Sequence, residues 1–533
     1  MIDIMKNSID TVNLIPKYIK KACLIIFFGT VLSHSLFLIN YMPLFEDWPY
    51  IFEKMPFFSW DVNQGRYFSS IAYFLFGRMY SIPLLGYLVT FFMLSLTSVL
   101  LCSYWKVPKT TITYSFVGLA LTLQPYLLGA FSCLGYIENF FRLPFFAMVG
   151  FLLCEKVKAN NVKYSYKIFL LIGSALSFFY TFGAYPLIAN TIAVVFLGRL
   201  LIDFVLSKDK KISYLIFEHK YTMSVILIAF ILHCIIVFYL WHKGVVVFGD
   251  YNVGVISISE MSLRFWGTIK FILTYLYNYS VPFHPQAITL MWLFLLLLVC
   301  SVNVWNFMQE DFKVSRRILN CVLMGFLFFT ISMASFATNF VSIGSSAGRL
   351  EADFFGVAFF HVLILAILFN KEEKIVKNAV FLVCICLLWT CIIQDFICQK
   401  VCIFGFEAEK QQVFKIINRI ETTAGFEKDK SYKIFILGAC TPLKKSIYSH
   451  LYKNDSYNGD GGRLFKWSIM AGFHAFNIAP INIYTGYGYK WQQIQPAHDI
   501  ETFGLIRNEV FKAKPWPDLM AVQIKNDIIL VVL

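Results

Sequence analysis

The stretch ACLIIFFGTVLSHSLFLIN, Ala22 to Asn40, decides the class of fold. It is long and apolar enough to cross the hydrocarbon core of a bilayer, which is roughly 30 Å thick and takes about 20 helical residues. Shortly after it the chain carries Glu46-Asp47-Trp48, and then Gln64-Gly65-Arg66. Two carboxylates, an indole and a guanidinium therefore follow the point where the chain first leaves the membrane, where polar groups are costly to keep.

Apolar stretches of this kind recur along the chain, which is 58% hydrophobic, 18% aromatic and only 15% charged. That composition excludes a soluble globular protein and predicts a polytopic α-helical membrane protein. We expect about eleven transmembrane helices, near residues 22–40, 80–103, 110–129, 141–155, 168–182, 184–206, 221–241, 286–306, 319–338, 353–369 and 379–397.

The distribution of basic residues predicts the orientation, because Lys and Arg beside the spans are retained in the cytoplasm. With a cytoplasmic N-terminus, the inner segments hold 21 Lys or Arg and the four outer loops hold 8. The first apolar segment has no small-residue cleavage site and is predicted to be an uncleaved anchor. An odd number of spans then puts residues 398–533 outside, so we expect a membrane domain over 1–397 and an outer domain over 398–533.

The kind of cation also differs between the two sides. Five of the eight outer cations are arginines, whereas only three of the 21 inner ones are. The planar fork of Arg suits two oxygens of a phosphate, so this bias favours a phosphate-bearing ligand at the outer face. Chance in small numbers, or pairing with local acids, is the alternative. The outer arginines are Arg66, Arg78, Arg142, Arg264 and Arg349.

Four outer loops carry the candidate site residues. In the first, 41–79, the pattern from Val62 onward predicts a helix along the membrane interface that bears Gln64 and Arg66. The second, 130–143, sets Glu138-Asn139 beside Arg142. The third, 242–285, has Ser259 as a predicted N-cap of an amphipathic run that includes Arg264. The fourth, 339–352, has small residues beside Arg349 and could hold a ligand or be a flexible connection.

The composition changes after about residue 400, where long apolar runs vanish. Phe404 to Thr422 has the spacing of an amphipathic helix, and Tyr432 to Ala439 has the pattern of a buried strand. Ala521 to Ile524 and Ile528 to Leu533, separated by Asn526-Asp527, predict a terminal hairpin. The tail is thus expected to be a small α/β domain.

Outer carboxylates and arginines together suit glycosyl transfer from a lipid phosphate. That reaction needs a base for the acceptor hydroxyl and cations for the departing phosphate. Asp47 and Glu46 are the candidate bases, although acids at helix ends also cap helices or pair with neighbours. The nine His are scattered and the 13 Cys show no metal-site spacing, so no cofactor is predicted, and a divalent metal stays an open alternative.

The arrangement resembles the bacterial and phage-encoded membrane glucosyltransferases that decorate O-antigen, the glucosyl transferase type II family. The resemblance rests on Glu46-Asp47-Trp48 after the first span, Asn63-Gln64-Gly65-Arg66, the multi-span body, and a terminal strand pair after Lys514-Pro515-Trp516-Pro517. The family commonly shows two Asp where this chain has Glu46-Asp47, which leaves open which carboxylate is catalytic. Asp47 is favoured here.

The resemblance implies a type C glycosyltransferase fold in the bacterial inner membrane, with the catalytic acid in the first outer loop and the tail in the periplasm. The implied donor is glucose on undecaprenyl phosphate, and the implied acceptor is a lipid-linked O-antigen unit, with inversion at the anomeric carbon. Partners would thus be these substrates and membrane lipids, with no nucleic acid. The expected substrate-binding residues are Trp48, Gln64, Arg66, Glu138, Asn139, Arg142, Arg264 and Arg349.

Two other functions remain as alternatives. An O-antigen polymerase or ligase also uses outer arginines, but its usual large outer loop lies between late spans. A flippase for lipid-linked sugars needs cations along a path through the membrane, whereas the predicted spans hold almost no charged residues away from their ends.

Overall fold

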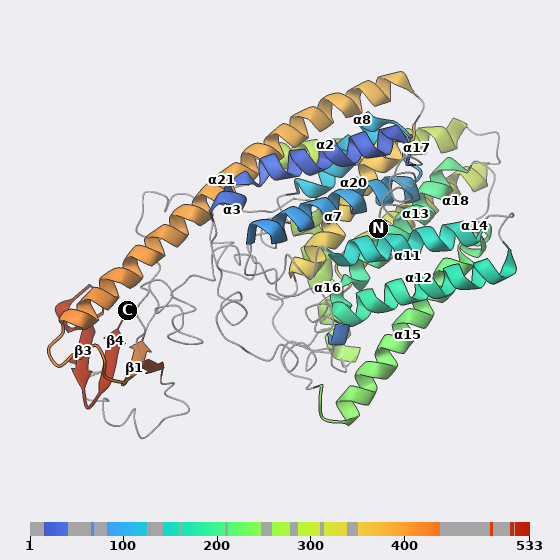
Figure 1. The fold of residues 1–533 in the computed structure, drawn as a ribbon. Coiled ribbons are helices and arrows are strands. Elements are labelled where there is room, and N and C mark those ends of the chain that lie inside the picture. The colour runs from blue at the N-terminus through green and yellow to red at the C-terminus, as the bar shows by residue number, and fades with distance from the viewer. Residues whose placement is uncertain are drawn as a thin grey trace, which may run out of the picture. The chain divides into compact units, whose positions relative to one another are not determined.

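Each predicted span lies on a helix in the computed structural model of the chain (Figure 1). The structure describes residues 15–40, 66–68, 83–124, 127, 142–158, 163–207, 212–246, 258–277, 286–309, 314–337, 350–371, 373–437, 491–493, 512–515 and 517–532. Within these residues seven helices are long and apolar enough to cross a membrane, which makes a polytopic helical membrane protein. They are α7 (Pro83–Tyr104), α12 (Tyr164–Ala184), α13 (Ala189–Leu206), α15 (Lys220–His242), α17 (Gln286–Gln309), α18 (Val314–Ser335) and the Lys374–Ile397 part of α21 (Lys374–Thr422).

The other four predicted spans form helices that are shorter or more polar. The first is split into α2 (Lys17–Ser33) and α3 (Ser35–Ile39), and α11 (Arg142–Val157) has only 16 residues. α8 (Thr111–Thr122) and the Phe355–Phe369 part of α20 (Leu350–Phe369) are apolar but short. Eleven as the number of spans therefore stays a prediction.

Burial separates helices at the centre of the bundle from those at its surface. Every residue of α20 from Phe355 to Phe369 is buried, and the helix contacts α8, α13, α17 and α18. By contrast, α15 contacts chiefly α12 and leaves large apolar side chains such as Leu227 and Phe238 exposed. Such an exposed apolar surface is what a helix beside lipid requires.

Shorter helical elements connect the long helices in the part of the chain that the structure describes. α14 (Ile212–Glu218) precedes α15, and the 3₁₀ turn η4 (Pro186–Ile188) separates α12 from α13. α16 (Ile258–Phe271) continues into η5 (Ile272–Tyr277), a π-helical stretch. The prediction that Ser259 caps α16 is wrong, because the helix already begins at Ile258 and Ser259 lies in its first turn.

The chain forms two compact units, with a boundary in α21 between Ile397 and Cys398. The amphipathic helix predicted from Phe404 is not a separate element. It is the C-terminal part of α21, which runs unbroken to Thr422. No proline lies between Lys374 and Thr422, so nothing in the backbone forces an end to the helix after the last span.

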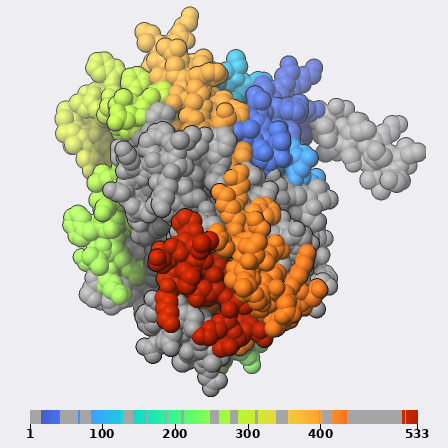
Figure 2. All heavy atoms as spheres, turned by 90° about the vertical axis from the view of Figure 1, so that its left-hand side faces the viewer, coloured from blue at the N-terminus to red at the C-terminus, as the bar shows by residue number. Residues whose placement is uncertain are grey.

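The second unit contains a four-stranded sheet with the order β2-β1-β4-β3. β1 (Tyr432–Leu437) pairs in parallel with β2 (Trp491–Gln493) and β4 (Ile528–Val532), and β3 (Val522–Lys525) is antiparallel to β4. Phe435, Ile528 and Leu530 form a small core, and Figure 2 shows the C-terminal strands (red) beside the end of α21 (orange).

The strand predictions for Tyr432 onward and for the terminal hairpin are confirmed. Asn526 and Asp527 join β3 to β4 with φ of 51° and 58°, the left-handed pair that a two-residue type I′ hairpin requires. Asn and Asp tolerate this conformation better than most residues, which is why the sequence signal was reliable. The place of this unit relative to a membrane stays a prediction.

Candidate functional site

Three of the predicted site residues lie in the part of the chain that the structure describes: Arg66, Arg142 and Arg264. The other predicted site residues lie outside the described residues, and their roles stay predictions. These are Glu46, Asp47, Trp48, Gln64, Glu138, Asn139 and Arg349.

Arg66 begins a short segment of the first outer loop that is held against the helix bundle. Its guanidinium carbon lies 4.5 Å from the centre of the Tyr185 ring, at the C-terminal end of α12. The next residue, Tyr67, places its hydroxyl 3.1 Å from Nδ1 of His233 on α15, and the two rings stack. Burial raises the pKa of the Tyr67 hydroxyl, so it stays neutral through the physiological range.

Phe68 completes this anchored segment. Its ring meets Phe179 edge-on at 5.2 Å and lies 5.7 Å from the ring of Tyr180. We call Tyr67, Phe68, Phe179, Tyr180 and Tyr185 the α12 aromatic cluster, since three of its five members lie on or just after that helix.

A glycine makes room for the cluster. A Cβ added to Gly183, in the last turn of α12, would lie 2.6 Å from Cε2 of Tyr67 and closer still to Phe68. Carbon atoms in contact are normally about 3.5–4.0 Å apart, so no larger residue fits without moving both rings. The absence of a side chain at Gly183 thus lets Tyr67 and Phe68 approach α12.

Arg142 borders the same cluster. It is the first residue of α11, and it lies near enough to Tyr180 to act electrostatically on the phenol. Tyr180 in turn contacts Phe68 and, at 4.8 Å, Phe146 of α11. The structure therefore stacks one predicted phosphate-binding arginine, Arg66, on the cluster and puts a second, Arg142, within electrostatic range of it. Arg264 belongs to α16, and its grouping with them stays a prediction.

A buried polar layer near the break between α2 and α3 was missed by the sequence analysis. Oγ of Ser33 donates to Oδ2 of Asp395 on α21 at 2.9 Å, and Nε2 of His34 lies 3.3 Å from the carbonyl oxygen of Thr122 and 3.9 Å from Oδ2 of Asp395. Thr30 adds a hydroxyl contact to Thr122 at 2.8 Å. A single acid at the end of an apolar run gives no sign in sequence that it faces a histidine from another helix.

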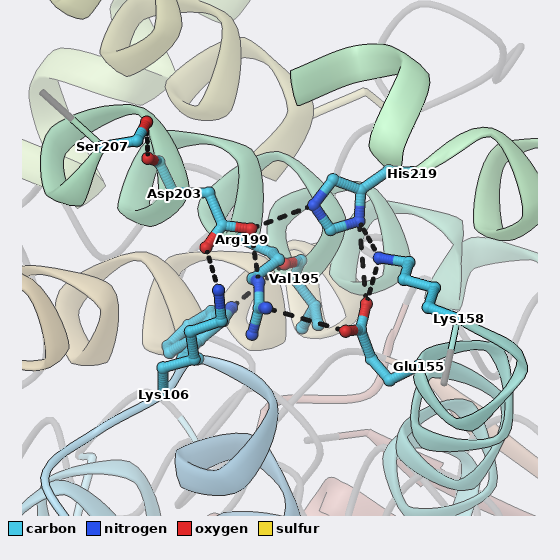
Figure 3. A network of polar contacts seen from close by, with 9 residues as sticks. Lys106, Glu155, Lys158, Val195, Arg199, Asp203, Ser207 and His219 are labelled. Carbon is cyan, nitrogen blue, oxygen red and sulfur yellow. Dashed lines mark hydrogen bonds and ion pairs between the residues drawn. The ribbon is translucent and has the colours of Figure 1, made fainter. Parts of the chain in front are cut away.

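A second missed feature is a network of charged side chains that joins four helices (Figure 3). The carboxylate of Asp203 on α13 accepts hydrogen bonds from Nζ of Lys106, Nε of Arg199 and Nε2 of His219, at 2.8, 2.8 and 3.0 Å. Lys106 is the second residue after the end of α7, and His219 directly precedes α15. Arg199 and His219 are almost completely buried, with side chains 4% and 1% exposed.

The other side of His219 is occupied by an ion pair on α11. Nζ of Lys158 donates to Oε1 of Glu155 at 2.6 Å and to Nδ1 of His219 at 3.0 Å. Glu155 also lies 3.7 Å from Arg199. Because a carboxylate only accepts and an ammonium only donates, His219 must carry its hydrogen on Nε2 and accept at Nδ1. The imidazole thereby links Asp203 to the Glu155–Lys158 pair (Figure 3).

No group of three or more His, Cys, Asp or Glu with the geometry to hold a metal ion occurs among the described residues. The described part of the chain therefore identifies no metal ligands. Whether the protein uses a divalent ion stays open, as it was in the sequence analysis.

Comparison with known proteins does not assign the chain to a family. No family model matches it, and neither a curated protein nor a solved structure matches it. The chain is thus established as a polytopic helical membrane protein by its own helices, and its activity has to be proposed from its residues.

Replacement of Gly183 tests the docking of the first outer loop. We expect Gly183→Ala to lower the free energy of unfolding by about 1–3 kcal/mol, because the added methyl overpacks the Tyr67 and Phe68 rings. Gly86→Ala on α7 is the matched control. Nothing lies within 4 Å of a Cβ there, and alanine should stabilise the helix by up to about 1 kcal/mol. Thermal unfolding of the purified protein in detergent measures both, and equal effects would contradict the proposed docking.

Replacement of Asp203 tests the four-helix network. We expect Asp203→Asn to destabilise the protein by about 3–5 kcal/mol, because Arg199 would stay buried without its main counter-charge. Asp527→Asn removes the carboxylate from an exposed pair with Lys430, 2.7 Å long, and keeps a residue that tolerates the turn conformation. That control should unfold like the wild type. A similarly small effect at Asp203 would show that the network does not hold the helices.

Proposed function

We propose that the protein transfers a glycosyl group from an undecaprenyl-phosphate-linked sugar to a lipid-linked O-antigen acceptor at the periplasmic face of the inner membrane. Glucose is the sugar that the family resemblance implies. The observation that carries the proposal is the stacking of Arg66 on Tyr185 of the α12 aromatic cluster, with Arg142 near enough to Tyr180 to act on it electrostatically, because both arginines come from segments predicted to lie outside.

A phosphate donor explains why arginine would be held in this way. Stacking on Tyr185 uses the face of the Arg66 guanidinium, whereas hydrogen bonds to phosphate oxygens use its edge. A guanidinium fixed by stacking loses less entropy on binding than a mobile one. Arg66 would then stabilise the charge that develops on the phosphate as the sugar departs, with Arg142 as a second cation.

Aromatic rings beside these cations suit the rest of the donor. The faces of Tyr and Phe rings pack against the apolar faces of sugars and against isoprenoid chains. In the proposed reaction Asp47 removes the proton from the acceptor hydroxyl, and the hydroxyl oxygen attacks the anomeric carbon. The bond from that carbon to the phosphate oxygen breaks, and polyprenyl phosphate leaves with the bonding electrons. Attack from the opposite face inverts the anomeric centre.

The charged network limits the movements that the flippase alternative could use. Alternating access requires groups of helices to move against each other around a central site. Asp203, Arg199 and His219 tie the ends of α7, α11, α13 and α15 together, so these four helices would have to move as one group. An O-antigen polymerase or ligase remains the alternative within enzymes.

A direct assay tests the proposal. Purified protein is incubated with synthetic polyprenyl phosphate glucose and a lipid-linked oligosaccharide, and the products are analysed by mass spectrometry for a new glycosidic bond. We expect one hexose to be added with release of polyprenyl phosphate. Asp47→Asn should abolish the product, and Glu46→Gln is the matched control for the adjacent carboxylate. Full activity of Asp47→Asn would remove Asp47 as the base, and oligosaccharide polymerisation instead would favour the polymerase.

Arg66 can be tested within the same assay. We expect Arg66→Lys to lower kcat/KM by about tenfold to hundredfold, because a hydrogen bond to a charged group contributes roughly 1.5–3 kcal/mol and lysine lacks the planar fork. Tyr185→Phe keeps the ring under the guanidinium and should retain most of the activity. An unchanged kcat/KM in Arg66→Lys would exclude a bidentate contact from Arg66 to the donor.

A further inference from the structure

α16 exposes large apolar side chains although it is not one of the membrane-crossing helices. Leu263, Phe265 and Trp266 are 75%, 37% and 66% exposed. The helix has 14 residues and continues into the six residues of η5, but it includes Glu260, Arg264 and Lys270, so it is too polar to span a bilayer. Exposed apolar groups of this size call for a partner surface.

The two sides of α16 differ. Thr268 is completely buried and its hydroxyl bonds to the carbonyl oxygen of Arg264, and Ile272 just beyond the helix is buried as well. At 100° per residue, Leu263 and Trp266 lie on the side away from Thr268, and the exposed Lys270 lies between them. The helix therefore packs on the protein with the side that includes Thr268, and its exposed surface carries Leu263 and Trp266 together with the exposed polar residues Glu260, Ser262 and Lys270.

The attachment of α16 places it at the membrane boundary. The ring of Phe271 stacks on Phe336, 6.2 Å away, and Phe336 directly follows the end of α18 at Ser335. The η5 stretch contacts α17, α18 and α20. α17 begins after η5 in the chain at Gln286, and within four residues it exposes Leu290, which is 65% exposed. Through Phe271 and η5, α16 is thus attached to helices of the bundle near the C-terminal end of α18, and α17 exposes apolar surface close to its own start.

We propose that α16 lies in the plane of the bilayer surface, with Leu263 and Trp266 in the outer part of the acyl chains and Lys270 at the lipid phosphates. The occupant of this surface is a phospholipid leaflet. Short amphipathic helices with aromatic residues on one side and cations beside them bind at this depth, and lysine extends its charge toward the headgroups while its stem stays in the apolar layer. The proposal is independent of glycosyl transfer.

Depth-dependent quenching tests this position. Full-length protein is reconstituted in liposomes whose lipids are brominated either near the ester group or near the methyl end of the acyl chain. The contribution of Trp266 is the difference between wild type and Trp266→Phe. We expect most of this contribution to be lost with the shallow bromines and little with the deep ones. Trp389 is the matched control, because it is 65% exposed inside the Lys374–Ile397 span and should respond more to the deep bromines.

Photocrosslinking gives a second readout that does not depend on tryptophan emission. A benzophenone amino acid replaces Leu263, and the reconstituted protein is irradiated and analysed by mass spectrometry. Lipid adducts are expected. Crosslinks only to protein, or quenching of Trp266 by aqueous iodide and by neither brominated lipid, would overturn the proposal. Stronger quenching by the deep bromines than by the shallow ones would also overturn it, because the helix would then lie within the membrane core.

Discussion

A polar group inside a bilayer has no water to bond, and this constraint explains where the described part of the chain puts its polar side chains. Hydroxyls within helices bond to carbonyl oxygens one turn earlier, as Ser95, Ser98 and Ser332 do with Phe91, Leu94 and Phe328. Charged groups that cannot be satisfied within one helix are gathered between helices. The carboxylate of Asp203 accepts three donors from three segments, and it is this concentration of contacts that fixes four helix ends relative to one another.

The network also agrees with the alternating order of the helices. The end of α7, the end of α11, the end of α13 and the start of α15 meet in it, as consecutive antiparallel spans would place them. The α12 aromatic cluster joins the opposite ends of α11 and α12 to the segment at Arg66. The ion pairs around Asp203 thus lie at one end of the bundle. The α12 aromatic cluster, with Arg66 and Arg142 near it, lies at the other end. Which end faces the periplasm is a prediction from the basic residues alone.

Features that depend on one segment were predictable from the sequence, and those that depend on two were not. Apolar runs of about 20 residues predicted the helices, and Asn526-Asp527 predicted the hairpin, because length and local backbone preference determine both. The contact of Tyr67 with His233 joins residues 166 positions apart, and that of Ser33 with Asp395 joins residues 362 apart. Nothing in a single sequence reveals such pairs. The sequence likewise does not distinguish Gly183 from other helical glycines, although the rings of Tyr67 and Phe68 lie against it.

These distant contacts bear on the motif Glu46-Asp47-Trp48, which lies in sequence between two anchored points. On one side, Ser33 and His34 at the break after α2 are held by Asp395 and Thr122. On the other, Arg66 and Tyr67 are held by Tyr185 and His233. These anchors set where the chain leaves the bundle on either side of the motif. If Asp47 is the catalytic base, the residues that matter for its position therefore include buried ones that need not touch a substrate. Their loss would lower turnover while leaving the chemistry of the carboxylate unchanged.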